Sequence, residues 1–199
     1  MSGGRVLITG ATSGIGFQLA LDYRRAGWQV WGCGRDGERL LALGRHGITP
    51  LQFDGRDASA VSEAAASLPR VDLVILNAGN CEYMDVAEGF DGALFARVIE
   101  TNLVATGHAL AAFLPLLGAG GRLAIVSSSV SWLPLPRAEA YGASKAALDY
   151  LADTLRLDLA SKGIGVTLIR PGFVQTPLTA KNDFPMPCLV TVEEASRAI

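Results

Sequence analysis

The apolar residues of this chain gather in short runs that turn residues separate from one another. Within each run nearly every position is apolar, and valine, leucine and isoleucine are frequent. Such runs are typical of strands that are buried on both faces of a parallel sheet. We predict six strands of this kind, at Arg5–Thr9, Gln29–Cys33, Thr49–Phe53, Leu73–Leu76, Arg122–Ser127 and Val166–Ile169.

Longer segments between these runs carry their apolar residues at helical spacing. Because strands and helices alternate, each helix should return the chain to the next parallel strand by a right-handed crossover. The pattern predicts an α/β fold, with a single doubly wound parallel sheet of at least six strands and helices on both faces. The expected helices are Ile15–Ala26, Gly37–Leu43, Ala58–Ser67, a long Phe90–Leu117 region broken near its start, and Ala140–Ser161.

No repeat, low-complexity tract or linker-like stretch interrupts residues 1–199, so we expect a single domain. The pattern changes after Pro171, because residues 172–190 are rich in proline and show neither a helical nor an alternating period. Such a segment predicts a loop on the substrate side of a site. A last helix is expected over residues 192–199, with Thr191 as its N-cap and Glu193 and Glu194 in its first turn.

The charge balance argues against nucleic-acid and membrane partners. Lys plus Arg number 17 against 19 Asp plus Glu, the formal net charge is −2, and no block of like charges occurs. The mean hydropathy is +0.32, but the apolar runs end well before the ~18 residues of a membrane span. Residues 6–9 already have the character of a core strand rather than of a leader. We therefore expect a cytoplasmic protein.

The cysteine and histidine residues form no recognisable metal or disulfide pattern. Cys33, Cys81 and Cys188 lie far apart in the sequence, and His46 and His108 have no second ligand at a suitable spacing. We expect three free thiols and no metal.

A glycine-rich turn lies between the first predicted strand and the first predicted helix. Gly10, Gly14 and Gly16 follow the spacing G-x-x-x-G-x-G. Glycine allows a tight turn here and a close approach of the backbone to a pyrophosphate at the helix N-terminus. The spacing differs from the usual G-x-G-x-x-G, and similar turns occur in methyltransferases or as plain tight turns. A bound dinucleotide is the interpretation that we favour.

Tyr141 and Lys145 form a pair that indicates proton-transfer chemistry. Residues four apart on a helix share one face, so the Lys145 ammonium can lie beside the Tyr141 phenol. A tyrosine ordinarily titrates near pH ~10. A neighbouring cation would lower the phenol pKa toward the working pH, where general acid–base catalysis is most effective. Either residue alone could be an ordinary helix position; together they favour catalysis.

Six motifs in this order resemble those of the short-chain dehydrogenase/reductase family. The resemblance covers essentially the whole chain and implies a Rossmann-type fold and an NAD(P)-dependent oxidoreductase that acts on a carbonyl/alcohol pair. Leu76 departs from the family, which often has a second asparagine there. The length departs too, since relatives usually continue through a further helix and strand, and we expect a C-terminal truncation. The motifs are Thr9-Gly10-x-x-x-Gly14-x-Gly16, Asn77-Ala78-Gly79, Asn102, Ser128, Tyr141-x-x-x-Lys145 and Pro171-Gly172.

The resemblance implies four catalytic residues. Tyr141 would donate a proton to a substrate carbonyl oxygen or take one from an alcohol, and Ser128 would hydrogen-bond the same oxygen. Lys145 would lower the Tyr141 pKa and bond the nicotinamide ribose. Asn102 would hold a water that connects Lys145 to solvent. Strand alternation should turn the two serines that flank Ser128 toward the opposite face, which favours Ser128 itself.

The end of the second strand bears on the choice of nicotinamide cofactor. NAD-preferring relatives carry an acid where this chain has Gly34, and the Arg35 guanidinium that follows suits a phosphate. Arg35 could instead be a solvated turn residue while Asp36 meets a ribose, so NADP(H) is favoured over NAD(H) but both stay open. By resemblance, Asp54 would contact the adenine. The cofactor contacts we expect are Gly10, Thr12, Ser13, Gly14, Ile15, Gly16, Arg35, Asp54, Asn77, Ala78, Gly79, Tyr141, Lys145, Pro171, Gly172, Val174 and Thr176.

Apolar side chains near the end of the sixth strand could form a substrate pocket, which would suit a small hydrophobic carbonyl or alcohol. They could equally serve only to pack the loop onto the domain. By resemblance, the Val174 backbone and Thr176 would hold the nicotinamide carboxamide. The side chains concerned are Trp132, Leu133, Phe173, Leu178, Phe184 and Met186.

Two other functions are compatible with the glycine turn: a non-catalytic dinucleotide-binding sensor or scaffold, and a methyltransferase. The presence of Ser128, Tyr141 and Lys145 argues against both. Relatives pair the helix predicted at residues 140–161 with its symmetry mate, so the resemblance implies a homodimer or homotetramer. That helix presents Ala146, Ala147, Leu151, Leu155 and Leu159.

Overall fold

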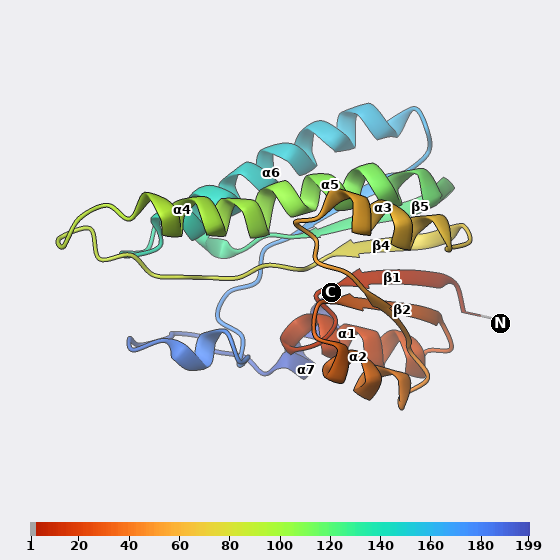
Figure 1. Cartoon of the computed structure of the whole chain (residues 1–199), viewed down its shortest axis with the longest axis horizontal. Coiled ribbons are helices and arrows are strands. Elements are labelled where there is room, and N and C mark those ends of the chain that lie inside the picture. Colours follow the sequence, from red (N-terminus) through yellow and green to blue (C-terminus); the bar gives the residue numbers. More distant parts are fainter. Residues whose placement is uncertain (1–2) are drawn as a thin grey trace.

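The computed structural model describes residues 3–199 and contains a six-stranded parallel sheet between two layers of helices (Figure 1). The strands follow the order β3-β2-β1-β4-β5-β6. The direction of winding reverses between β1 and β4, the place where open α/β sheets bind ligands. The doubly wound fold expected from the sequence is confirmed. The strands are β1 (Arg5–Thr9), β2 (Gln29–Gly34), β3 (Thr49–Gln52), β4 (Val71–Leu76), β5 (Leu117–Val126) and β6 (Gly165–Ile169).

Helices cover both faces of the sheet. In Figure 1, α1, α2 and α7 lie on one side of it, and α3 to α6 lie on the other. The α-helices are α1 (Gly14–Arg25), α2 (Gly37–Gly44), α3 (Ala58–Ala66), α4 (Gly92–Ile99), α5 (Ala105–Phe113), α6 (Glu139–Ala160) and α7 (Val192–Ala198). Four shorter helical turns complete them: the π-helical η1 (Glu100–Val104) and the 3-10 turns η2 (Leu114–Leu116), η3 (Ser129–Ser131) and η4 (Thr179–Lys181).

Polar side chains fix where several helices begin. Asp36, Asp57 and Asp91 stand at the N-caps of α2, α3 and α4, and each accepts hydrogen bonds from backbone N–H groups of the first turn. Thr191 caps α7 in a capping box, because its hydroxyl accepts from the Glu194 N–H and the Glu194 carboxylate accepts from the Thr191 N–H. The N-cap predicted for this helix is confirmed.

The long helical region predicted over residues 90–117 differs from the prediction in two ways. Its interruption lies in the middle, where η1 separates α4 from α5, rather than near its start. Its end is earlier, since β5 begins at Leu117 and not at Arg122. Leu117 pairs with Val71 of β4, and a shift of register between Val71 and Leu73 accommodates the glycine-rich stretch that follows Leu117. That pairing joins residues distant in sequence.

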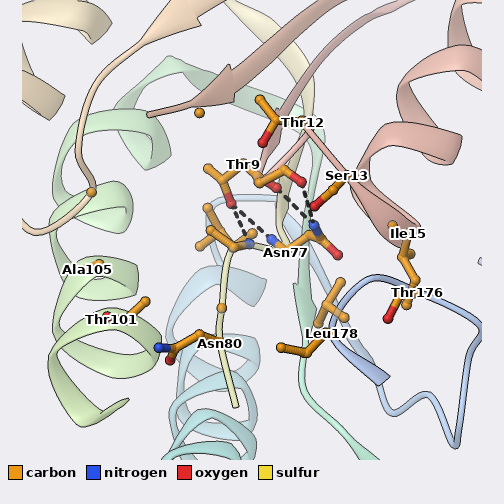
Figure 2. A pocket seen from close by; sticks show the side chains of 18 of the residues that line it. Thr9, Thr12, Ser13, Ile15, Asn77, Asn80, Thr101, Ala105, Thr176 and Leu178 are labelled. Carbon is orange, nitrogen blue, oxygen red and sulfur yellow. Dashed lines mark hydrogen bonds between the residues drawn. The ribbon is translucent and has the colours of Figure 1, made fainter. Parts of the chain in front are cut away.

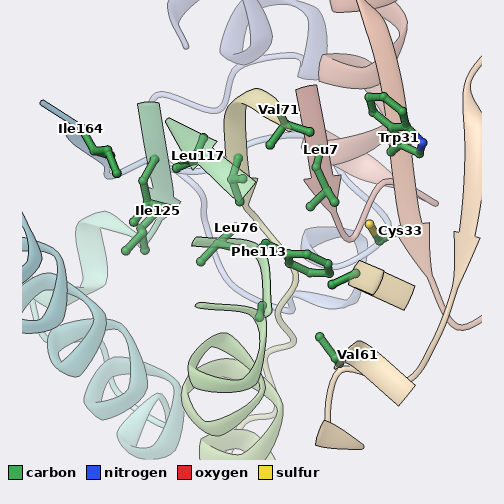
Figure 3. Packing of buried hydrophobic residues seen from close by; sticks show 14 of the residues in the cluster. Leu7, Trp31, Cys33, Val61, Val71, Leu76, Phe113, Leu117, Ile125 and Ile164 are labelled. Atoms are coloured by element: carbon green, nitrogen blue, oxygen red, sulfur yellow. The ribbon is translucent and has the colours of Figure 1, made fainter. Parts of the chain in front are cut away.

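The hydrophobic core has two parts, one on each face of the sheet. Alternate residues of a strand point to opposite faces, so Leu7 of β1 packs under α3 and α5 while its neighbours Val6 and Ile8 pack under α1 and α2. Figure 3 shows the first part, in which Leu7 and Val61 lie near the Phe113 ring of α5. Because every strand except β3 contributes to both parts, the carboxyl ends of the strands are held firmly along one edge.

Candidate active site

A cavity of about 500 Å³ opens along the carboxyl edge of the sheet. Residues from the ends of β1, β2, β4 and β5, the start of α1, helix α6 and the segment after β6 line it. Of the residues predicted to bind a cofactor or to catalyse, Gly16 and Asn102 lie off its wall. Those that line it are Gly10, Thr12, Ser13, Gly14, Ile15, Arg35, Asp54, Asn77, Ala78, Gly79, Ser128, Tyr141, Lys145, Pro171, Gly172, Val174 and Thr176.

The glycine turn forms one end of the cavity because side chains cannot fit there. Gly10 has a φ of 66°, and a Cβ on it would lie 2.8 Å from the Ala78 Cα. A Cβ on Gly16 would lie 2.4 Å from the Gly10 carbonyl oxygen, so Gly16 serves the packing of α1 against the turn rather than the cavity wall. The first turn of α1, which begins at Gly14, therefore points its backbone N–H groups at the cavity, an arrangement that suits an anion.

Asn77 ties this turn to the end of β4. Its side-chain amide donates to the carbonyl oxygens of Thr9 (3.1 Å) and Gly10 (3.3 Å). In return, the Thr9 hydroxyl accepts from the backbone N–H groups of Asn77 (3.0 Å) and Ala78 (3.1 Å), as the dashed lines in Figure 2 show. These bonds hold the two strand ends on either side of the switch point at a fixed spacing.

The end of the cavity at β2 and β3 is rich in guanidinium groups. Arg56 donates to Asp54 at 2.6 Å, and the Arg35 guanidinium lies 3.8 Å from the same carboxylate. The hydrogen bond from Arg56 is the main cause that lowers the pKa of Asp54 to about 2, with Arg35 adding to it and burial opposing it. Arg39 also lines this end and pairs with Asp36. Three guanidiniums therefore face two carboxylates there, which leaves one net positive charge.

The end of β2 carries Gly34 where an acid could stand, and the packing there is close. A Cβ on Gly34 would lie 2.5 Å from the Thr12 Cγ2. A carboxylate at this position would therefore require the Thr12 side chain to change its rotamer.

Ser128, Tyr141 and Lys145 meet on the opposite wall of the cavity. Ser128 follows β5 and caps the turn η3, while Tyr141 and Lys145 lie one turn apart on α6. The Lys145 ammonium is buried, donates to the Val126 carbonyl oxygen at 2.9 Å, and lies 5.7 Å from the centre of the Tyr141 ring. Ser127, by contrast, points away and donates to the Lys145 carbonyl oxygen at 3.1 Å.

The protonation of these groups differs from the prediction. Burial raises the pKa of Tyr141 to about 12, and the hydrogen bond with Ser128 opposes that rise. The expected net lowering of this pKa is therefore not met in this structure, because burial of the phenol outweighs any attraction from the Lys145 ammonium, which donates to the Val126 carbonyl oxygen. Burial lowers the pKa of Lys145 to about 8, against the attraction of Cys81 and Asp149. At pH 7 the phenol is neutral and the amine is mainly charged.

Asn102 lies behind the cavity wall, in the π-helical turn η1, and is fully buried. Its side-chain oxygen accepts a hydrogen bond from the Asn80 backbone N–H at 2.8 Å. Its side-chain nitrogen donates to the Asn80 backbone carbonyl oxygen at 2.9 Å and to the Ser144 hydroxyl at 3.0 Å. A Cβ on Gly79 would lie 3.2 Å from the Asn102 Oδ1 and 3.5 Å from the Lys145 Nζ. Asn102 thus cross-links the loop after β4 to α6, close to Lys145.

The segment after β6 closes the cavity from the side of residues 172–190. Thr176 and Leu178 lie beside the start of α1, as Figure 2 shows, and a Cβ on Gly14 would lie 3.2 Å from the Thr176 methyl group. The Thr179 hydroxyl donates to the Val174 carbonyl oxygen at 2.6 Å, which folds this segment into a compact turn.

Of the six apolar side chains predicted to wall a substrate pocket, only Leu178 lines the cavity. Trp132 and Leu133 are exposed. Phe173 and Phe184 pack against each other, with ring centroids 6.1 Å apart, and Phe184 also meets Tyr83. Of the two interpretations that the sequence left open, packing of the loop therefore holds for Phe173 and Phe184.

Sequence reasoning missed several residues of the cavity wall, among them two near the catalytic wall and two arginines. Asn80 and Thr179 lie near the catalytic wall, and Arg39 and Arg56 lie at the guanidinium-rich end. Asn80 follows the Asn-Ala-Gly motif directly, which was a usable signal. Arg56 lies two residues after Asp54, which was predicted to contact the adenine, and that proximity was a signal as well.

The structure also bears on metals and membranes. Residues 3–199 contain no cluster of three histidine, cysteine or acidic side chains that could hold a metal ion. The three cysteines are free, with Cys33 buried, Cys81 partly buried and Cys188 exposed. None of the helices described over those residues is both long and apolar enough to cross a membrane.

Comparisons with known proteins agree with this geometry. Residues 5–185 match the family model of the short chain dehydrogenases. The chain is 36% identical to an uncharacterized oxidoreductase of Myxococcus xanthus, over 98% of this chain and 81% of that protein. It is 37% identical to a sulfoacetaldehyde reductase of Chromohalobacter salexigens, over 87% and 74%.

A solved structure is similar over the whole length. A short chain dehydrogenase from Burkholderia cenocepacia, crystallised in complex with NADP, superposes with a TM-score of 0.90 at 28% identity. The match covers 100% of this chain and 83% of that one.

Proposed function

This chain belongs to the short-chain dehydrogenase/reductase family and is an NAD(P)-dependent oxidoreductase, and from that premise we propose that it reduces a small-molecule carbonyl with NADPH. Tyr141 is the general acid in this proposal, and the reverse oxidation uses it as the base. One observation carries the proposal: Ser128, Tyr141 and Lys145 share one wall of a cavity whose other end is a glycine turn built for an anion. A non-catalytic sensor gains no support from any feature of this site.

The cavity fits a dinucleotide. The N–H groups of the first turn of α1 suit a pyrophosphate. Gly10 leaves room for the pyrophosphate because it has no side chain, and its φ of 66° and its closeness to Ala78 permit only glycine there. We expect the nicotinamide to lie toward Pro171, Gly172, Val174 and Thr176, all on the cavity wall. The bound cofactor supplies the hydride.

The residues of this chain supply the proton and hold the substrate. A carbonyl oxygen that gains negative charge as hydride arrives can accept hydrogen bonds from the Tyr141 phenol and the Ser128 hydroxyl. The phenol gives its proton to that oxygen and becomes a phenolate. The charged Lys145, 5.7 Å from the ring centre, stabilises the phenolate. The water relay through Asn102 remains part of the proposal.

The resting protonation state favours reduction at neutral pH. A general acid must hold its proton, and with a pKa raised to about 12 Tyr141 does so across the physiological range. Oxidation of an alcohol needs the phenolate, whose fraction rises about tenfold with each pH unit below that pKa.

We therefore expect kcat/KM for alcohol oxidation to rise steeply from about pH 7 to about pH 9, while kcat/KM for carbonyl reduction does not rise. Initial rates in both directions, in buffers of constant ionic strength, measure this. An oxidation rate that is constant over this range would contradict the raised pKa of Tyr141.

A preference for NADPH follows from the charge at the β2 end of the cavity. Gly34 occupies the position of a ribose-binding acid, the Thr12 methyl group crowds that position, and Arg35, Arg39 and Arg56 line the same end. A phosphate on the adenosine ribose would meet a net positive charge. Asp54, engaged by Arg56, is expected at the adenine.

Replacement of Arg35 by alanine is expected to weaken NADPH binding by about 10- to 100-fold, the loss of one charge-assisted phosphate contact. The dissociation constant of NADH should change by no more than about threefold, because NADH lacks that phosphate. Fluorescence titration of both cofactors measures this. Arg45→Ala, an exposed arginine at the end of α2 outside the cavity, is the control. Equal losses for both cofactors would rule out a phosphate contact.

The substrate is best sought by a screen. Cofactor titration followed by NADPH oxidation across carbonyl compounds tests the proposed function directly. Because the relative from Chromohalobacter salexigens is a sulfoacetaldehyde reductase, small anionic aldehydes belong in the screen beside neutral and hydrophobic ones. A chain that binds NADPH but oxidises it with none of them would count against the proposal.

We also propose a homo-oligomer that pairs through α6. Of the residues predicted to face a partner, Leu151, Leu155 and Leu159 pack against the core instead. The large apolar side chains that α6 leaves exposed are Tyr150 (79%) and Leu157 (78%).

Replacement of Leu157 by glutamate should therefore shift the protein to monomers in sedimentation velocity, because the change places a charge in each half of a symmetric interface. Leu41→Glu is the matched control, since Leu41 is 70% exposed but lies on α2, on the other face of the sheet. An unchanged sedimentation coefficient for Leu157→Glu would place the interface elsewhere.

A further inference from the structure

The ion pair between Asp149 and Arg170 joins two elements of the catalytic wall. Asp149 lies on α6, one turn beyond Lys145, and Arg170 follows β6 directly and precedes Pro171. The Arg170 Nε donates to the Asp149 Oδ2 at 2.7 Å. The Arg170 side chain is 22% exposed and the Asp149 side chain 12%. In every other ion pair within residues 3–199, both side chains are at least 34% exposed. Solvent therefore screens this pair least.

The pair is held from both sides. The Trp132 ring lies 4.0 Å from the Arg170 guanidinium carbon, so the ring covers the arginine face. On the other side, the Ser127 and Ser131 hydroxyls lie beside the Asp149 carboxylate. Burial raises the pKa of Asp149, but the polar contacts with Ser127, Ser131 and Arg170 outweigh it and hold the pKa below its ordinary value. The carboxylate is charged at neutral pH.

Hydrogen bonds extend from this pair to the reacting groups. Ser131 donates to the Ser128 carbonyl oxygen at 2.8 Å, and Ser127 donates to the Lys145 carbonyl oxygen at 3.1 Å. The backbone N–H of Ser129, which lies between Ser127 and Ser131 in the sequence, donates to the Pro171 carbonyl oxygen at 2.9 Å. Asp149 and Arg170 thus lie where the ends of β5 and β6 meet α6, and these three segments carry Ser128, Pro171 and the Tyr141–Lys145 pair.

Stability alone gives a poor reason for this arrangement. A buried ion pair gains little over well-packed apolar residues, because both charges lose their hydration. The second carboxylate oxygen of Asp149, Oδ1, is buried and lacks a hydrogen bond of good geometry among residues 3–199. Because this ion pair adds little to the free energy of unfolding, we explain it by the relative positions that it gives to the three segments.

We propose that Asp149 and Arg170 are positioning residues that set the distance between the Ser128–Tyr141 wall and the nicotinamide end of the cavity at Pro171. The inference rests on the proposed function. Neither side chain lines the cavity, so the pair acts through the segments it joins. A misplacement of about 1 Å between reacting groups can cost about 100-fold in rate.

The proposal predicts a loss of kcat without a loss of cofactor affinity. Asp149 and Arg170 form their ion pair with each other and not with the glycine turn or Arg35, which would supply most of that affinity. A shift of the segment that begins at Pro171 would chiefly misplace the nicotinamide. The nicotinamide fluorescence of bound NADPH reports that change separately from the dissociation constant.

The test compares Asp149→Asn, which is nearly isosteric, with Asp153→Asn, which breaks the exposed Arg156–Asp153 pair on the same helix. For Asp149→Asn we expect kcat to fall by at least ~10-fold, the NADPH dissociation constant to stay within about threefold, and the emission of bound NADPH to move toward that of free NADPH. Asp153→Asn should match the unmodified protein in all three. Thermal melting establishes that both variants are folded.

A second comparison separates positioning from a structural role. The double variant that combines Asp149→Asn with Arg170→Gln should lose no more kcat than either single variant, because both substitutions disrupt the same ion pair. Additive losses, or a folded Asp149→Asn variant with kcat within about twofold of the unmodified protein, would overturn the proposal. If the unmodified protein binds NADPH but reduces no carbonyl, the proposed function fails, while the emission shift of Asp149→Asn still decides the positioning role.

Discussion

Replacement of Tyr141 by phenylalanine should lower kcat for carbonyl reduction by about 10²- to 10⁴-fold, the usual contribution of a general acid. The change removes one hydroxyl at a buried position and leaves the ring in place on α6. The Ser128 hydroxyl can still bond the carbonyl oxygen, but it is a much poorer acid than the phenol. Steady-state kinetics with saturating NADPH measure the loss.

Two controls sharpen this test. The NADPH dissociation constant of Tyr141→Phe should remain within about threefold of the unmodified protein, because one neutral hydrogen bond contributes little net affinity. Tyr150→Phe makes the same change at an exposed site on the same helix and should leave kcat unchanged. If Tyr141→Phe retains most of its turnover, another group donates the proton and the proposed mechanism is wrong.

Replacement of Lys145 by methionine is expected to lower kcat by about 10²- to 10³-fold, as for the removal of one preorganised electrostatic contact. Methionine is of similar length and suits a buried position, but it has no charge with which to stabilise a phenolate at Tyr141. The change also leaves the Val126 carbonyl oxygen without its donor at 2.9 Å. Kinetics between about pH 7 and about pH 9 measure the effect, and the difference from the unmodified protein should narrow as Lys145 loses its proton near its pKa of about 8.

Lys162→Met provides the comparison for this variant, since Lys162 follows the same helix at an exposed site. A fall in thermal stability without a fall in kcat would make Lys145 a structural residue. A fall in kcat would support the role proposed for it at the phenol, and an accompanying loss of NADPH affinity of up to about tenfold would support its role at the ribose.

Local sequence was sufficient for the order of elements and for the glycine turn. Strands buried on both faces must be apolar at successive positions, so Val6, Leu7 and Ile8 marked β1 without knowledge of what covers it. The positive φ of Gly10 and Gly14 is likewise a local property that only glycine tolerates well. The spacing of Tyr141 and Lys145 predicted their shared face for the same reason.

Packing between distant segments decided other features that the sequence left open or indicated wrongly. The Tyr141 pKa is raised because burial outweighs the hydrogen bond with Ser128. The sequence left open whether the aromatic residues of 172–190 face a substrate or pack the loop, and in the structure Phe173 and Phe184 pack on one another. The π-helical turn η1 carries Asn102 behind the wall of the cavity.

The sequence by itself thus determined the doubly wound sheet, the place of the glycine turn and the residue types that meet at the sheet edge, because periodicity, backbone freedom and helical spacing act over a few residues. The tertiary structure alone decided which charges meet there. The Arg35 guanidinium lies 3.8 Å from Asp54 of the next strand's end, and Arg170 reaches Asp149 across 21 positions. Desolvation and such long-range contacts arise only when the strands and helices are packed together, and they set the protonation and the alignment of the catalytic wall.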